Sequence, residues 1–376
     1  MSTKRWILAG LSFAAAIGAS IYIVFTTWPE QRNPAILPLW AHAVAAGIVA
    51  LEVLARGVKF KLSAASLRVP LSLNAALRVC LGGDFGAAIT PGRTGAEPAR
   101  FLVLSEAGVP VARNLLLLYL EMFLEMSSLA LVAIGLGILY RHEGGAALRG
   151  VLGVVGIYTM AVLGVGALGI VMARRNASGP PPPWATALRL DAGRWRGVQR
   201  WLRRMRSIVA EVRAARLGLL SLAYLASVVH ILLRILILPL LVFALGVASA
   251  PLAALVLWPL ALIYGAVVAP IPGGGGLVEV TFKHFLGDSI PAPIFGAALI
   301  WWRFYSFYVY VILGALAAGR SVMRALRAPD KRPGGSHESL DAPDTREGDA
   351  LAGDPDVRAP HPADLQPPAR APVRDP

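Results

Sequence analysis

Residues 269–279 read Ala269-Pro270-Ile271-Pro272-Gly273-Gly274-Gly275-Gly276-Leu277-Val278-Glu279. The two prolines lack amide donors and the four glycines disfavour a helix, so no helix is expected to continue through this stretch. Apolar runs flank it on both sides, which places the break at membrane depth. Unsatisfied backbone groups are costly in hydrocarbon, so protein or a wet cavity must surround this backbone. Broken helices of this kind mark binding sites in transporters.

The composition around this break is that of a helical membrane protein. The 376 residues are 56% hydrophobic and 15% charged, and several apolar runs approach the length that crosses a bilayer. We therefore predict an all-α, polytopic integral membrane protein. The formal charge is +14, but many arginines lie between apolar runs, where they set topology, so no nucleic acid partner is predicted. A single cysteine, Cys80, excludes an internal disulfide, and we predict no cofactor or metal.

Six full spans are predicted, at about residues 6–27, 36–55, 112–140, 150–172, 217–247 and 292–316. The first has the outline of a signal peptide, but its apolar run is as long as a membrane is thick, which favours an uncleaved helix. Basic residues cluster after the second span and are expected in the cytoplasm: Arg56, Lys59, Lys61 and Arg68. Eight crossings are an alternative that keeps both termini on the same side.

The segment 174–216 carries eleven arginines against two acidic residues. This bias places it, together with both termini, on the cytoplasmic side of the membrane. Within 194–216, apolar residues at spacings of three and four predict a basic amphipathic helix. That helix either lies on anionic inner-leaflet headgroups or packs on its own protein. The Pro-rich, acidic tail at 328–376 is predicted to be disordered, which leaves residues 1–327 as the transmembrane domain.

A second break lies earlier in the chain and reads Thr90-Pro91-Gly92-Arg93-Thr94-Gly95-Ala96-Glu97-Pro98-Ala99-Arg100. Residues 71–109 are too polar for an ordinary lipid-facing span, so we predict a re-entrant hairpin that enters from the cytoplasm. Residues 252–290 are predicted to form an opposed hairpin that enters from outside. The two tips are expected to meet near the midplane, where their backbone amides face a shared anion.

Ionisable residues inside the apolar segments need partners or water, because a charge at the bilayer centre costs about 2.5–3.5 kcal/mol. One interpretation is mutual neutralisation that fixes the packing. The other is a polar cavity, in which arginines hold a phosphate and carboxylates face an amine, a sugar or a proton. The candidate headgroup-binding residues are Arg93, Glu97, Arg100, Glu121, Glu125, Arg234, Glu279 and Arg303, and the candidate hinge residues are Pro91, Gly92, Pro270, Pro272, Gly273, Gly274 and Gly276.

Over about residues 5–325 the chain resembles the flippase-like, lysylphosphatidylglycerol synthase transmembrane-region family. The resemblance rests on the two broken segments and on Arg303-Phe304-Tyr305 in the last span. A glutamate-arginine pair of the family corresponds here to Glu121-Met122, so that site is only partly matched. No soluble synthase domain follows in this sequence, and synthase activity is not expected. The resemblance implies lipid translocation or the handling of lipid headgroups.

Three functions agree with these observations. The preferred one is a lipid transporter that moves a phosphate-bearing headgroup through a polar cavity while the acyl chains stay in the bilayer. The second is a non-catalytic membrane partner of a separate lipid-modifying enzyme, which docks through the basic loop. The third is a lipid-linked transferase with Glu97 or Glu279 as general base, although the sequence shows neither a metal cluster nor a nucleophile-base pair. The sequence leaves the lipid and the oligomeric state open.

Overall fold

The structure is a computed structural model that describes residues 18, 22, 36–143, 145–174, 195–197, 199, 200, 203, 206, 210, 214–247, 250–265, 274 and 276–327. Within these ranges every regular element is a helix, which confirms the predicted all-α class. Four helical segments are long and apolar enough to cross a membrane: Val111–Leu139, Leu148–Leu168, Leu217–Ala244 and Ala292–Ser321. They coincide with four of the six predicted spans.

Three predicted regions lie wholly or mostly outside the described residues. They are the first span, of which only Gly18 and Tyr22 are described, the basic segment 174–216 and the tail at 328–376. The amphipathic helix and the disordered tail therefore stay predictions.

Helix α2, Leu39–Ser66, corrects the second predicted span and its cytoplasmic flank. The helix continues well beyond residue 55, and Arg56 and Lys59 are only 5% and 2% exposed. These two cations lie in the interior because carboxylates from other helices pair with them. Only Lys61 and Arg68 of the predicted basic cluster are exposed.

The first predicted hairpin is present as α3 (Leu73–Ala88), the short turn η1 (Pro91–Arg93) and α4 (Ala96–Glu106). At 1.5 Å per residue, α3 and α4 are about 24 and 16 Å long, too short to cross a hydrocarbon core of about 30 Å. The Thr90 hydroxyl closes the turn, since it accepts from the Gly95 amide and donates to the Gly86 carbonyl, both at 2.8 Å. A Cβ atom on Gly86 or Gly95 would come closer than 3 Å to the other residue, so this packing requires both glycines.

The second hairpin has the same half-length construction. Helices α11 (Leu252–Gly265) and α12 (Leu277–Leu286) are about 21 and 15 Å long by the same rise per residue. They pack together through Trp258 and Phe285, whose ring centroids lie 3.7 Å apart. Between them, Pro270, Pro272 and Gly273 lie outside the described residues. Gly276 ends the break with a φ of +80°, a conformation that glycine adopts without strain.

Two of the predicted spans are interrupted helices. Helix α9 (Leu217–Ile235) gives way to α10 (Ile237–Ala244), because Pro239 has no amide to bond the Ile235 carbonyl. The last span consists of α13 (Ala292–Arg303), a π-helical turn η4 (Phe304–Tyr308) and α14 (Val309–Arg327). It runs past the predicted end at 316. Such π-helical turns occur frequently at functional sites.

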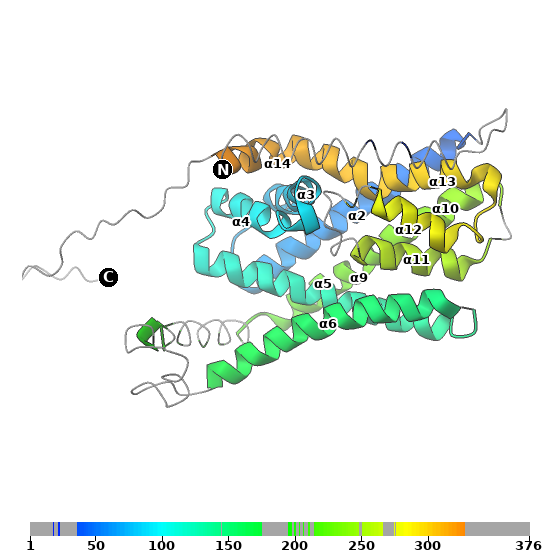
Figure 1. Cartoon of the computed structure of the whole chain (residues 1–376). Coiled ribbons are helices and arrows are strands. Elements are labelled where there is room, and N and C mark those ends of the chain that lie inside the picture. Colours follow the sequence, from blue (N-terminus) through cyan, green and yellow to red (C-terminus); the bar gives the residue numbers. More distant parts are fainter. Residues whose placement is uncertain are drawn as a thin grey trace, which may run out of the picture. The chain divides into compact units, whose positions relative to one another are not determined.

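The two hairpins pack on the two helices that flank this π-helical turn (Figure 1). Helices α3 and α4 pack along α14, whereas α12 contacts α13 through Phe282, whose ring lies 4.9 Å from that of Trp302. Helix α2 packs between α9 and α3, and α5 (Val111–Leu139) packs on α6 (Gly145–Arg174). The segment around residues 303–311 is therefore the place where residues of both hairpins meet.

Candidate functional site

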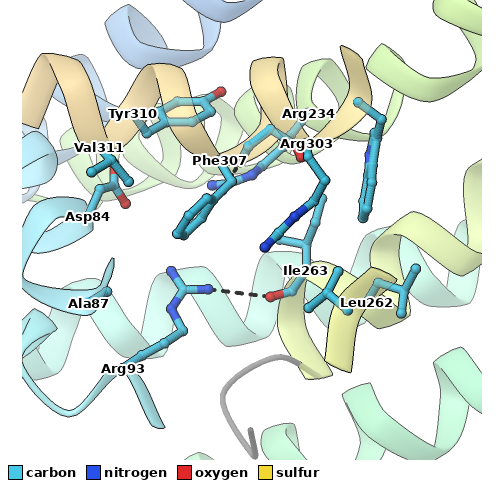
Figure 2. A pocket seen from close by; sticks show the side chains of 13 residues that line it. Asp84, Ala87, Arg93, Arg234, Leu262, Ile263, Arg303, Phe307, Tyr310 and Val311 are labelled. Atoms are coloured by element: carbon cyan, nitrogen blue, oxygen red, sulfur yellow. Dashed lines mark hydrogen bonds between the residues drawn. The ribbon is translucent and has the colours of Figure 1, made fainter. Parts of the chain in front are cut away.

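A small cavity lies at this meeting point, and we call it the arginine cavity (Figure 2). Its volume is about 40 Å³, enough by this measure for roughly three water molecules. Three guanidinium groups and one carboxylate face an otherwise largely apolar lining. The lining residues are Asp84, Ala87, Arg93, Arg234, Leu262, Ile263, Val278, Trp302, Arg303, Ser306, Phe307, Tyr310 and Val311.

Arg93 comes from the tip of the first hairpin. Its backbone has a φ of +56°, a conformation that costs a side-chain-bearing residue of order 1 kcal/mol and is found mainly where a site requires it. The guanidinium donates to the carbonyl of Ile263 on α11 at 3.3 Å, so the two hairpins touch here. Within the described ranges no carboxylate forms an ion pair with Arg93. Among the described residues, its positive charge therefore points into the cavity without an ion-pair partner.

Arg303, at the end of α13, is held in the opposite way. Its Nε donates to Glu279 Oε1 at 2.7 Å, and its guanidinium lies 4.7 Å from the centre of the Phe307 ring. Glu279 in turn accepts from the Gly276 amide at 2.8 Å, so this carboxylate also caps the first turn of α12. The second broken segment thus fixes a carboxylate, and that carboxylate orients an arginine toward the cavity.

Arg234 of α9 reaches the cavity from a third direction. It donates to the carbonyl of Ser306 in the π-helical turn at 3.2 Å and lies 4.8 Å from the centre of the Tyr310 ring. Its Nη1 is 3.6 Å from Glu52 Oε1, the closest carboxylate contact of Arg234 among the described residues. Arg93, Arg234 and Arg303 thus come from three separate helical elements and converge on one space. Such a set of rigid, forked donors suits a phosphate or another oxyanion.

A cluster of buried ion pairs adjoins the cavity, and we call it the α2 ion cluster. Arg56 contacts Glu52 at 3.0 Å on its own helix and Asp84 of α3 at 2.7 Å. Asp84 also lines the cavity, so the two sites share a residue. The members are Glu52, Arg56, Lys59, Asp84, Glu121, Glu125 and His230.

Lys59 is the centre of this cluster. Its ammonium group lies 2.7 Å from Glu121 and bonds Glu125 as well, and it is 3.5 Å from His230 Nε2. Glu125 also accepts from the Tyr264 hydroxyl at 3.0 Å and lies 2.9 Å from His230 Nε2. Each charged group here is surrounded by opposite charges, as the neutralisation interpretation requires.

The predicted site residues therefore divide into three groups. Arg93, Arg234 and Arg303 line the cavity, and Glu279 stands directly behind Arg303. Glu121 and Glu125 lie in the α2 ion cluster. Glu97 and Arg100 do not join the cavity lining: they pair with each other at 2.9 Å, and Glu97 is about half exposed.

The predicted hinge residues Pro91, Gly92, Gly274 and Gly276 are described, and the three glycines have positive φ angles. Gly275 lies outside the described residues, so the predicted meeting of the two tips is represented only by the contact of Arg93 with Ile263.

Sequence reasoning missed Glu52, Asp84, Lys59 and Tyr310 as part of the site. A signal for α2 is present, because Glu52, Arg56, Lys59 and Ser63 recur at spacings of three and four and so share one helix face. Among the described residues no group of three or more histidine, cysteine or acidic side chains is arranged to hold a metal.

A sequence profile of the lysylphosphatidylglycerol synthase TM region matches residues 7–314, the greater part of the chain. The match includes both hairpins, the arginine cavity and the α2 ion cluster. No curated protein matches the chain significantly.

Proposed function

Because the chain belongs to the lysylphosphatidylglycerol synthase TM region family, whose membrane proteins are related to lipid modification or translocation, we propose that it translocates a phosphate-bearing lipid. The lipid phosphate would bind in the arginine cavity while the acyl chains remain in the bilayer. The observation that carries this proposal is the convergence of Arg93, Arg234 and Arg303 on one cavity among membrane-spanning helices.

The charges of the three arginines support an anionic ligand. Arg303 already has Glu279 as a partner and Arg234 has a longer contact with Glu52, whereas Arg93 bonds only a backbone carbonyl among the described residues. Placing an uncompensated guanidinium at membrane depth is costly. A bound phosphate would place a negative charge beside Arg93 and accept paired hydrogen bonds from Arg93 and Arg303.

The size of the cavity restricts what it holds. A volume of about 40 Å³ suits a phosphate group alone better than a whole lipid headgroup. Passage of a larger headgroup requires the two hairpins to separate, and among the described residues the hydrogen bond from Arg93 to the Ile263 carbonyl is one contact between them that must open. We infer that the hairpins are the moving parts of the transporter.

The proposal also includes the orientation of the chain in the membrane and a role for the basic segment 174–216. We propose a bacterial cytoplasmic membrane with both termini and the basic segment 174–216 inside, because the arginine clusters then obey one topology rule. The arginines of 194–216 would bind anionic inner-leaflet headgroups and recruit substrate from that leaflet.

Translocation is tested in vesicles reconstituted with the purified full chain and a trace of fluorescent phosphatidylglycerol. Dithionite bleaches only label on the outer leaflet, so flipping increases the bleached fraction. We expect flipping with the unmodified chain and at least about a tenfold slower rate with Arg93→Gln, since the unpaired donor fork is lost. Arg113→Gln, which removes an exposed arginine from α5, is the matched control.

Two further measurements separate the alternatives. Fluorescent phosphatidylcholine compares a zwitterionic headgroup, and competition by inorganic phosphate distinguishes a site for free phosphate from one for lipid. Binding of phosphatidylglycerol without flipping would support the non-catalytic partner function, and equal rates for Arg93→Gln and Arg113→Gln would remove the arginine cavity from the pathway.

A further inference from the structure

The imidazole of His230 stands between two carboxylates in the α2 ion cluster and is fully buried. Its Nε2 lies 2.9 Å from Glu125 Oε2, and its Nδ1 lies 3.6 Å from Glu52 Oε1. A carboxylate cannot donate, so Nε2 carries the hydrogen in the contact with Glu125. In the neutral imidazole the bare Nδ1 then faces the Glu52 carboxylate.

Nδ1 of His230 has no hydrogen-bond partner among the described residues, and the side chains of His230 and Glu52 are both completely buried. The Glu52 carboxylate contacts the guanidinium groups of Arg56 at 3.0 Å and Arg234 at 3.6 Å, but among the described residues neither of its oxygens accepts a well-aligned hydrogen bond. Two acceptors that face each other in the interior are unfavourable, and one added proton on Nδ1 would turn this contact into an ion pair. The geometry therefore defines a place for a proton.

The charged groups around His230 come from several helices. Glu52 and Lys59 approach from α2, and Glu125 approaches from α5 with Glu121 on the far side of Lys59. The hydroxyl of Tyr264 of α11 reaches Glu125, and Arg234 lies one turn further along α9 itself. Helix α10 carries no titratable residue.

The same oxygen of Glu52 connects His230 to the arginine cavity. Glu52 Oε1 is 3.6 Å from His230 Nδ1 and also 3.6 Å from Arg234 Nη1, and Arg234 lines the cavity. An anion that draws the Arg234 guanidinium toward itself leaves Glu52 with less positive charge beside it. Arg56 contacts the same oxygen at 3.0 Å, but it already carries its full charge and shares it with Asp84, so the imidazole is the neighbour that can gain a charge.

The overall charge favours the same coupling. The arginine cavity and the α2 ion cluster, with Glu279, contain five carboxylates, and Arg56, Lys59, Arg93, Arg234 and Arg303 supply five cations. This buried set is neutral when the cavity is empty and His230 is uncharged. A bound anion makes the set negative, which is costly in a low-dielectric interior, and one proton restores neutrality.

We propose that anion binding in the arginine cavity is linked to the uptake of one proton at Nδ1 of His230. The proposal rests on the anion site proposed above. It adds a proton, bound at His230, as a second ligand whose binding is coupled to that of the anion. Linkage is reciprocal, so binding of the anion tightens as the pH falls, by at most about tenfold per pH unit when one proton is taken up per anion. A transmembrane proton gradient could then drive lipid movement.

The test is calorimetric titration of the detergent-solubilised full chain with dihexanoylphosphatidylglycerol, whose phosphodiester keeps a constant charge near neutral pH. The titration is run at about pH 7.5, once in HEPES and once in Tris. These buffers release different heats when they give up a proton, so the difference in binding heat counts the protons taken up. We expect between about half a proton and one proton per bound lipid.

The variants locate the proton. His230→Gln should reduce the uptake to none, and Glu52→Gln should lower it because the imidazolium loses the carboxylate that faces Nδ1. His284→Gln, which removes an exposed histidine from α12, should leave the uptake unchanged. The buffer comparison on the unmodified chain tests the linkage even if a variant does not fold.

The outcomes are distinguishable. Binding with equal heats in both buffers overturns the linkage and leaves the anion site intact. No binding in either buffer overturns the anion site and the linkage with it. Proton uptake that persists in His230→Gln overturns the assignment to this imidazole.

Discussion

Lys59 and Arg93 illustrate how differently two neighbouring regions of this protein treat a cation. In the α2 ion cluster, Lys59 contacts two carboxylates and is 2% exposed, so its charge is fully compensated by the protein. In the arginine cavity, Arg93 bonds one backbone carbonyl and faces open space from a positive-φ backbone. The first arrangement stabilises the fold, whereas the second reserves charge for a ligand. Both interpretations of the intramembrane charges therefore apply, each to a different region.

The largest effect on stability is expected at Lys59, whose charge is compensated by two carboxylates. Lys59→Met leaves Glu121 and Glu125 buried without their cation, and breaking a buried pair in this way typically costs about 3–5 kcal/mol. Denaturant unfolding in detergent measures the change. Lys61→Met, exposed on the same helix, should cost less than about 0.5 kcal/mol. Equal losses for the two variants would show that the cluster does not hold the helices together.

An intermediate effect is expected at Glu279. Its carboxylate is paired and buried, like those of the α2 ion cluster, but its partner Arg303 lines the arginine cavity. Glu279→Gln keeps the size and an acceptor for the Gly276 amide but removes the charge that Arg303 requires, at a cost of about 1–3 kcal/mol. Translocation should also be lost, because Arg303 is no longer oriented. Asp288→Asn, an exposed change just after α12, is the control, and unchanged flipping in Glu279→Gln would contradict the orienting role.

A smaller effect on stability, but a clear one on transport, is expected at Arg93. Arg93→Lys retains the charge and loses the planar fork, so the free energy of unfolding should change by less than about 1 kcal/mol because only one hydrogen bond is involved. Flipping of phosphatidylglycerol should fall by about fivefold, which corresponds to roughly 1 kcal/mol of lost phosphate binding. If Arg93→Lys lost as much stability as Lys59→Met, Arg93 would have a structural role like that of Lys59, and the two regions would not differ in the way described.

The smallest effect is expected at Glu97. Its pair with Arg100 is at 2.9 Å but partly exposed, and such pairs contribute about 0.2–1 kcal/mol. Glu97→Gln should therefore unfold nearly as the unmodified chain does and flip lipid within about a factor of two. A tenfold slower rate in the same vesicles would return Glu97 and Arg100 to the substrate path that the sequence suggested.

The sequence by itself determined the features that depend on neighbouring residues. The lengths of apolar runs predicted the helical membrane class and four spans that the structure contains, because crossing a bilayer is a property of one continuous segment. The Pro-Gly breaks predicted the half-length hairpins, since proline and glycine act on the local backbone. Arg93, Arg234 and Arg303 were likewise recognised as costly charges inside apolar segments.

Only the tertiary structure decided which charge meets which. Arg56 and Lys59 read as a cytoplasmic flank because a basic residue after an apolar run usually marks the membrane surface. Their carboxylate partners on α3 and α5 lie far away in the chain, and no local pattern reports such contacts. For the same reason the sequence placed Arg93, Arg100, Arg234 and Arg303 in one candidate phosphate site, whereas the fold brings three of them to the cavity and leaves Arg100 paired with Glu97 outside its lining. Pairing of buried charges is a long-range property, and the fold alone sets it.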